Sequence, residues 1–169
     1  MSSLNKFDND LAWSEKASDA SFWQRIYERA FPSMVAQMPC PGDTESQRRG
    51  IDRLLLLSNG REVRIDEKKR RAEYDDILIE YVSNSTTGAP GWIEKDLAID
   101  YVAYAFFQSK RCYLLDWLLL KRAWQKHGSQ WKHYHQNIKA RNQGYNTWSV
   151  AVPTENLLDA ISDATVIEL

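Results

Sequence analysis

Apolar residues recur with different periods along this chain, and the period of each stretch predicts a helix or a strand. In residues 20–31 they return at every fourth position, which indicates one apolar helix face, and Pro32 predicts where that helix ends. The residues on and beside this face are Phe22, Trp23, Ile26, Tyr27 and Ala30. Residues 39–50 are rich in Pro, Gly and polar side chains and predict a loop.

The clearest local pattern is a β-hairpin. Residues 51–57 and 61–68 are both strand-like, and the Ser58-Asn59-Gly60 sequence between them is typical of a tight turn. The first run contains leucine without interruption from Leu54 to Leu57, so both of its faces are apolar and we expect an interior strand.

The remaining stretches predict a sheet with helices around it. We expect strands at 76–82, 97–107, 111–116 and 148–152, a loop at 83–91, a turn at 108–110, a helix at 118–127 that stops at Gly128, and a terminal helix from Thr154. Residues 97–107 also suit a helix, although a strand is favoured. The pattern predicts an α/β (α+β) fold, a single domain over residues 1–169 with a central mixed β-sheet, an antiparallel hairpin core and flanking helices.

Composition narrows the class of protein. A chain of 169 residues is long enough for one domain with a sizeable core. No stretch has the roughly 18 apolar residues of a membrane span, and Asp8 and Asp10 interrupt any secretory signal at the start. Cys40 and Cys112 show neither metal-site spacing nor a disulfide framework. We therefore expect a cytoplasmic protein with no membrane partner.

Charge is distributed unevenly, although the formal net charge is only −1. Residues 117–154 contain no Asp or Glu, and a basic run stands at residues 68–71. Such segregation can form a positive surface that attracts phosphate, although a solvated surface is the ordinary alternative. The residues expected to bind nucleic acid are Lys69, Arg70, Arg71, Lys121, Arg122, Lys126 and Lys132.

The hairpin also predicts a chemical site. If residues 58–60 form a three-residue loop with Gly60 in the left-handed conformation, Asp52 lies directly opposite Asp66, and Lys68 shares their face. Two facing carboxylates repel each other, so a cation is expected between them, and Mg²⁺ (or Mn²⁺) prefers oxygen ligands of this kind. We expect Asp52, Asp66 and Lys68 to be the catalytic residues of a metal-dependent phosphodiesterase.

Two alternatives remain open from the residues alone. A two-residue Asn59-Gly60 turn would place Asp52 opposite Glu67 and make Lys69 the accompanying cation. The first register is favoured because Asp66 and Lys68 continue the polar face of Glu62 and Arg64. In either register the acids and lysine can also be an ordinary salt-bridge cluster on the protein surface.

The order of elements in this chain resembles the PD-(D/E)XK nuclease superfamily, whose fold is restriction-endonuclease-like. That order is an N-terminal helix, then Asp52, a hairpin, and Asp66-Glu67-Lys68 on the second strand of the hairpin. The resemblance covers residues 20–82 and implies that Asp52 and Asp66 bind Mg²⁺, with the Glu67 carbonyl completing the coordination. It implies that Lys68 assists the attacking water. Gly50-Ile51 stands where the family often has Pro, and Glu28 suits an acid that many members place on the first helix.

The resulting expectation is a Mg²⁺-dependent nuclease that acts on DNA and that, if it cuts both strands, forms a homodimer. A nuclease acting on RNA is a variant of this hypothesis. The alternative class is a non-catalytic protein of the same fold that binds nucleic acid or a protein partner. Glu80 on the third strand is a further possible ligand.

Overall fold

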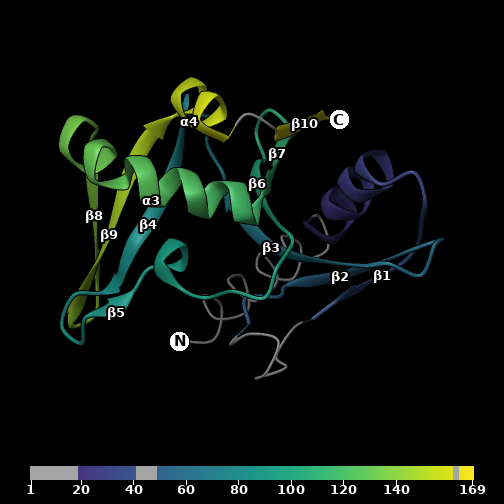
Figure 1. Cartoon of the computed structure of the whole chain (residues 1–169), viewed down its shortest axis with the longest axis horizontal. Coiled ribbons are helices and arrows are strands. Elements are labelled where there is room, and N and C mark those ends of the chain that lie inside the picture. Colours follow the sequence, from purple (N-terminus) through teal and green to yellow (C-terminus); the bar gives the residue numbers. More distant parts are fainter. Residues whose placement is uncertain (1–18, 41–48, 162–163) are drawn as a thin grey trace, which may run out of the picture.

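The computed structural model describes residues 19–40, 49–161 and 164–169, and in them the chain forms one α+β domain with two sheets (Figure 1). The first described element is the N-terminal helix, residues 19–30. The strands are β1 (Met34–Pro39), β2 (Arg53–Leu57), β3 (Glu62–Arg70), β4 (Asp76–Asn84), β5 (Ala89–Pro90), β6 (Tyr101–Phe106), β7 (Arg111–Asp116), β8 (Asn137–Asn142), β9 (Tyr145–Pro153) and β10 (Ala164–Glu168). The other helices are the short 3₁₀ helix η1 (Trp92–Glu94), α3 (Trp117–Tyr134) and α4 (Thr154–Ile161).

The first sheet has six strands in the order β1-β2-β3-β6-β7-β10. Only β3 and β6 pair in parallel, so the sheet is mixed as predicted. The N-terminal helix covers one face of this sheet, where its apolar side pairs with residues of β2, β3 and β7 (Figure 1). Ile26 and Tyr27 are completely buried there. The predicted helix face and its end before Pro32 are therefore confirmed.

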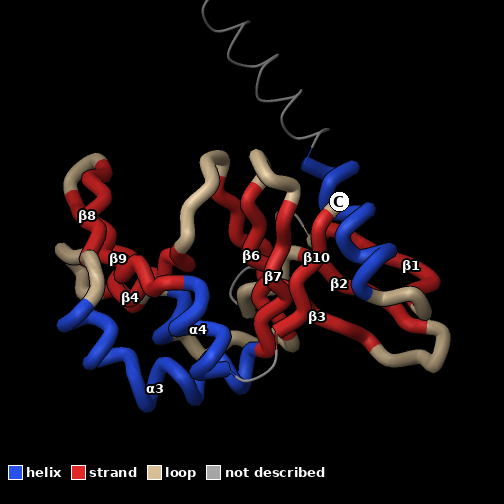
Figure 2. The backbone as a smooth tube through the Cα atoms, turned by 90° about the horizontal axis from the view of Figure 1, so that it is seen from above, coloured by secondary structure: helices blue, strands red, loops and turns tan. Residues whose placement is uncertain are grey.

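The second sheet has four antiparallel strands in the order β5-β4-β9-β8. Figure 2 shows the two sheets side by side, with α3 and α4 along the second one. A single apolar cluster joins them, because it contains Ile79 of β4, Val150 of β9, Phe106 of β6 and Leu120 of α3. The second sheet therefore packs against the first sheet through the face that the N-terminal helix leaves open.

The expectation of one central sheet was wrong for the strand at 76–82. Strand β3 already pairs with β2 on one edge and with β6 on the other. Neither edge of β3 is left for the next strand in the chain, so β4 joins β9 in the second sheet instead. The predicted strands at 97–107, 111–116 and 148–152 are confirmed within these ranges as β6, β7 and part of β9.

The predicted end of the central helix at Gly128 was also wrong, because α3 continues to Tyr134. Gly128 is buried in the helix and lies against the ring of Trp124, where a Cβ atom would come within 2.9 Å. Gly128 therefore allows the Trp124 ring to pack closely against the helix and does not end the helix. Asp116 begins the helix, since its carboxylate accepts a hydrogen bond from the Leu119 amide at 3.0 Å.

Four strands were not predicted: β1, β5, β8 and β10. The loop expected at 83–91 was wrong in part, because it contains β5 and the last two residues of β4. Strand β1 makes β2 an interior strand, as the leucine run predicts, but Leu56 is still 40% exposed because this end of the sheet extends beyond the second sheet. The terminal helix begins at Thr154 as expected. Most of the loop predicted at 39–50, and the start of the chain, lie outside the described residues.

Among the described helices, none has the length and apolar character of a membrane span.

A substitution at Gly91 tests how tightly η1 is joined to the second sheet. A Cβ atom at this position would overlap the backbone carbonyl of Glu80, which cannot move without disturbing β4. We expect Gly91→Ala to lower the free energy of unfolding by about 2–4 kcal/mol. Gly88→Ala is the control, because Gly88 has nothing within 4 Å and only a positive φ of 73°. It should cost about 1 kcal/mol. Equal losses in urea unfolding would contradict this packing.

Candidate functional site

The hairpin between β2 and β3 has the three-residue loop predicted from the sequence. The Leu57 amide donates to the Arg61 carbonyl at 2.9 Å, and the Gly60 amide donates to the Leu57 carbonyl at 2.9 Å. Gly60 has a φ of 82°, in the left-handed region. The strand register pairs Arg53 with Ile65, so the favoured register is confirmed and the one that faces Asp52 with Glu67 is wrong.

This register brings the two predicted acids together at the end of β2. Asp52 stands just before β2, and its amide donates to the carbonyl of Ile65, the partner of Arg53, at 2.9 Å. Asp52 and Asp66 line one pocket, and the Asp52 carboxylate is close enough to raise the pKa of Asp66. The Asp52 carboxylate also accepts a hydrogen bond from the Glu67 amide at 2.8 Å. Asp52 is exposed, whereas Asp66 is only 3% exposed.

Lys68 lies on the same face and binds the buried acid. Its ammonium is 2.5 Å from Asp66 Oδ1 and 5.8 Å from the centre of the Trp92 ring. The other oxygen, Asp66 Oδ2, is buried and has no hydrogen-bond partner among the described residues. A buried carboxylate oxygen without a donor carries a free-energy penalty that a bound cation would remove.

The pKa of Asp66 reflects this environment. It is raised from 3.8 to about 7: burial is the largest cause, the nearby Lys68 ammonium opposes the increase, and the Asp52 carboxylate adds to it. Asp66 is desolvated because it pairs with Val102 of β6 in the interior of the sheet. Near neutral pH, a proton on Asp66 therefore competes with any cation for this carboxylate.

A pocket of about 430 Å³ opens at the acid pair. Asp52, Asp66 and Lys68 line it together with Gly50 from the chain before β2. Its other lining residues are Trp92, Lys95 and Leu97 from the segment between β5 and β6. The three predicted catalytic residues therefore share one pocket that a ligand can enter.

The Glu67 side chain lies on the opposite face of the sheet. Its carboxylate accepts a hydrogen bond from the Tyr27 hydroxyl at 2.9 Å and pairs with the Arg53 guanidinium at 2.5 Å. Only the Glu67 backbone remains on the site side. Because the N–H and C=O of one strand residue point to the same edge, the Glu67 carbonyl lies on the side of Asp52, as its amide does.

The residues present provide oxygen donors of the kind that Mg²⁺ prefers. They are the Asp52 and Asp66 carboxylates and the Glu67 carbonyl, and the orphaned Asp66 oxygen supports a cation there. Within the described ranges no group of three or more His, Cys, Asp and Glu residues has metal-site geometry. Mg²⁺ would therefore keep several water ligands at this site, which is its usual behaviour in proteins.

The two further acids considered from the sequence do not line this pocket. Glu28 is exposed on the N-terminal helix, which covers the other face of the sheet, and accepts a hydrogen bond from Gln24 at 2.9 Å. Glu80 belongs to β4 in the second sheet, and its carbonyl packs against Gly91.

The expected nucleic-acid contacts do not form one continuous surface. Lys69 pairs with Asp19, and Arg70 pairs with Asp76 at 2.6 Å. Lys121 donates to two backbone carbonyls, and Lys132 lies over the rings of Tyr81 and Trp124. Arg71 is exposed next to Arg70.

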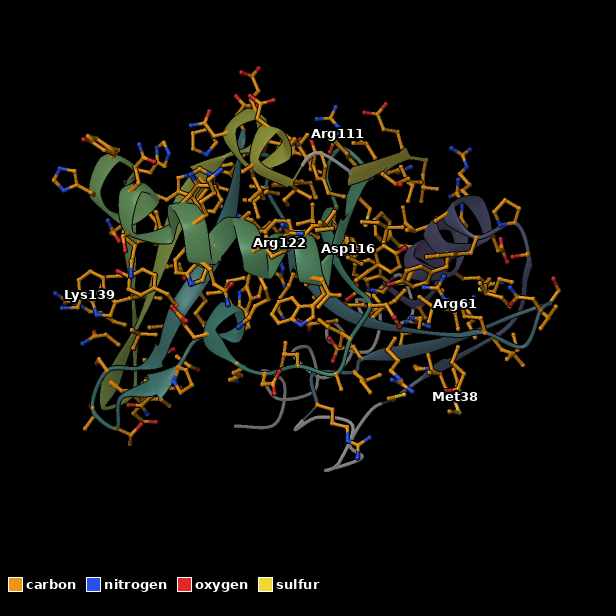
Figure 3. All side chains as sticks on the ribbon, viewed as in Figure 1. Met38, Arg61, Arg111, Asp116, Arg122 and Lys139 are labelled. Atoms are coloured by element: carbon orange, nitrogen blue, oxygen red, sulfur yellow. The ribbon has the colours of Figure 1, made fainter. Side chains whose placement is uncertain are left out.

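Arg122 and Lys126 line a different pocket of about 580 Å³ between α3 and α4. Figure 3 labels Arg122 on α3 and Lys139 on β8, which lie well apart from each other. The acid-free stretch 117–154 is thus spread over α3, β8 and β9 rather than gathered at the acid pair.

The sequence analysis did not include Lys95 or the rest of the η1 segment in the site. The hairpin acids were found because a local turn sets their register, whereas the η1 segment reaches them through long-range packing.

Comparison of the chain with protein-family models, curated proteins and solved structures gives no significant match.

The pKa of Asp66 predicts how stability depends on pH when no metal is present. Well below pH 3.8 this carboxyl is protonated in both the folded and the unfolded protein. As the pH rises from 4 to 7 the unfolded chain ionises first, so the folded state progressively loses stability, and the loss is complete above pH 7. Asp66→Asn removes this cost and should stabilise the protein at pH 8 by about 2–4 kcal/mol.

Urea unfolding in EDTA at pH 4, 6 and 8 measures this effect. The difference between Asp66→Asn and the wild type should grow with pH. Asp75→Asn, at an exposed position, should show no such trend. A difference that stays constant from pH 4 to pH 8 would mean that the buried carboxylate carries no such cost.

Proposed function

We propose that this protein is a Mg²⁺-dependent nuclease that hydrolyses phosphodiester bonds in DNA at the pocket of Asp52, Asp66 and Lys68. The observation that carries the proposal is the buried Asp66 carboxylate. One of its oxygens pairs with Lys68 and the other has no donor, and a second carboxylate lies beside it in an open pocket. A purely structural salt bridge does not require the second acid or the unpaired oxygen.

The resemblance to the PD-(D/E)XK superfamily supports the same proposal. The two acids and the lysine stand on an antiparallel hairpin behind an N-terminal helix, in the order Asp52, Asp66, Lys68. The departure is the strand after the hairpin, which belongs to the second sheet. The proposed family membership therefore rests on the helix, the hairpin and the site.

In this proposal the Asp52 and Asp66 carboxylates and the Glu67 carbonyl would hold the metal. When bound, Mg²⁺ supplies a Lewis acid that polarises the phosphoryl oxygen and lowers the pKa of a coordinated water. Lys68 keeps its ammonium 2.5 Å from Asp66 and within the same pocket. From there it can hold the attacking water by a hydrogen bond or stabilise the negative charge that develops on the phosphate.

Asp66 has a second role before catalysis. Its raised pKa means that the proton must leave before both carboxylates can act as ligands. Lys68 favours that loss, since its positive charge stabilises the ionised form of Asp66. Activity that depends on both ionised acids should therefore increase between pH 6 and pH 8.

A non-catalytic protein of the same fold that binds nucleic acid is the second candidate. The observation that favours it is that only two carboxylates meet at the site among the described residues. A proton shared by Asp52 and Asp66, with Lys68 as a counterion, would satisfy this pair without a metal.

Cleavage assays distinguish the two candidates. Wild-type protein should cut plasmid or oligonucleotide DNA with Mg²⁺ or Mn²⁺ and stop in EDTA, and RNA should be assayed in parallel. Asp66→Asn and Lys68→Met should each lower the rate at least about 100-fold. Lys69→Met is the matched control, because Lys69 lies on the other face and pairs with Asp19. It should retain most of the activity.

Two results would contradict the site assignment. One is metal-dependent cleavage that survives in both Asp66→Asn and Lys68→Met. The other is equal loss in Lys68→Met and Lys69→Met, which would show that the lysines act only through general charge or folding. Binding of DNA by the wild type without cleavage under any metal condition would favour the second candidate.

A further inference from the structure

The pocket has a second basic residue, Lys95, which comes from outside the hairpin. Lys95 directly follows η1 and lines the pocket with Asp52, Asp66 and Lys68. The segment is far from the hairpin in sequence but is joined to it by two backbone hydrogen bonds. The Ala98 amide donates to the Arg49 carbonyl at 3.0 Å, and the Asp100 amide donates to the Arg64 carbonyl at 2.8 Å.

The η1 segment is held rigidly on its other side. The Gly91 amide donates to the Tyr81 carbonyl at 3.0 Å, and Gly91 packs so closely on β4 that no side chain fits. The Trp124 indole donates to the Glu94 carboxylate at 2.8 Å. Lys121 completes the attachment, since its ammonium donates to the Ile93 carbonyl at 2.9 Å and to the Lys95 carbonyl at 3.1 Å. Lys95 is therefore presented from a fixed backbone.

The two lysines of the pocket are in different situations. The Lys68 ammonium forms a salt bridge with Asp66 Oδ1 at 2.5 Å, and the Lys68 side chain is partly buried. The Lys95 side chain is exposed, and none of the described residues forms an ion pair or a hydrogen bond with its ammonium. A lysine ammonium is a compact point charge with three donors and suits a phosphate oxygen.

We propose that Lys95 is a phosphate-binding residue, which holds a phosphate of the nucleic-acid strand that lies in the pocket of Asp52 and Asp66. This inference rests on the proposed function and adds the group that receives the substrate. The Lys68 ammonium is already paired with Asp66, and the charge of a bound metal would be balanced by the two carboxylates. Lys95 supplies a positive charge at the same pocket, on a backbone that β4, α3 and the hairpin hold in place. Lys121, expected from the sequence to contact nucleic acid, instead positions the segment that carries Lys95.

The test compares Lys95→Gln and Lys95→Arg with Lys110→Asn. Lys110 lies in the turn between β6 and β7, and its φ of 56° suits asparagine. Both lysine side chains are exposed, so circular dichroism and thermal unfolding of all three variants should match the wild type. The first measurement is the affinity for a fluorescein-labelled DNA oligonucleotide at several NaCl concentrations, with Ca²⁺ in place of Mg²⁺. The second is steady-state cleavage with Mn²⁺.

Loss of one phosphate contact has a specific signature. Lys95→Gln should reduce the slope of log affinity against log salt by about 1, and it should raise KM about tenfold with a smaller change in kcat. Lys95→Arg should keep the wild-type slope, because the charge is retained. Lys110→Asn should behave as the wild type in both measurements.

The outcomes separate this inference from the proposed function. A wild-type enzyme that cleaves DNA, together with an unchanged slope and KM in Lys95→Gln, overturns the inference and leaves the nuclease standing. A reduced slope in Lys95→Gln with no cleavage by the wild type supports the phosphate contact and overturns the nuclease. Absence of DNA binding by the wild type, or an equal loss of slope in Lys110→Asn, overturns the inference.

Discussion

The constraint on which the site depends is a carboxylate held out of water beside a second carboxylate. Asp66 stands on β3, between β2 and β6, and burial is the largest cause of its raised pKa. The Lys68 ammonium pairs with one oxygen of Asp66, but the other oxygen has no hydrogen-bond donor among the described residues. Folding therefore places two like charges where they are costly, and a proton or a metal ion has to lower that cost. The proposed cation site rests on this arrangement rather than on any one residue type.

The fold holds the acids in this position through contacts on the reverse face of the same strands. Glu67 and Arg53 pair at 2.5 Å next to the Tyr27 hydroxyl, and Arg53 also donates to Gln37 of β1 at 3.1 Å. This network joins the N-terminal helix, β1, β2 and β3 at residues that are the immediate neighbours of Asp52 and Asp66. The backbone from which both acids project is therefore fixed from behind, while their side chains face the pocket. Burial raises the pKa of Glu67 as well, but Arg53 and Tyr27 both oppose that effect, so Glu67 has the partners that Asp66 lacks.

Sequence reasoning located the core of the site because a short-range signal determines it. Gly60 sets the loop, the loop sets the register, and the register brings Asp52 to Asp66. The second sheet was not predicted, because it depends on the parallel pairing of β3 with β6, which fills the edge of β3 through a strand distant in sequence. Gly128 was wrongly taken as the end of the central helix. It is a glycine because the Trp124 ring packs against it, and the local sequence pattern does not reveal that contact. Lys95 was missed for the same reason: its place in the pocket results from hydrogen bonds between segments that periodicity does not relate.

Titration calorimetry with Mn²⁺ tests the central claim most directly, because it detects the proposed cation at the acid pair without requiring a substrate. The account predicts that the wild type binds one Mn²⁺, that Asp52→Asn and Asp66→Asn each abolish or strongly weaken binding, and that Asp75→Asn leaves it unchanged. Equal binding of Mn²⁺ by the wild type and Asp66→Asn, or no binding by the wild type at pH 8, would contradict it.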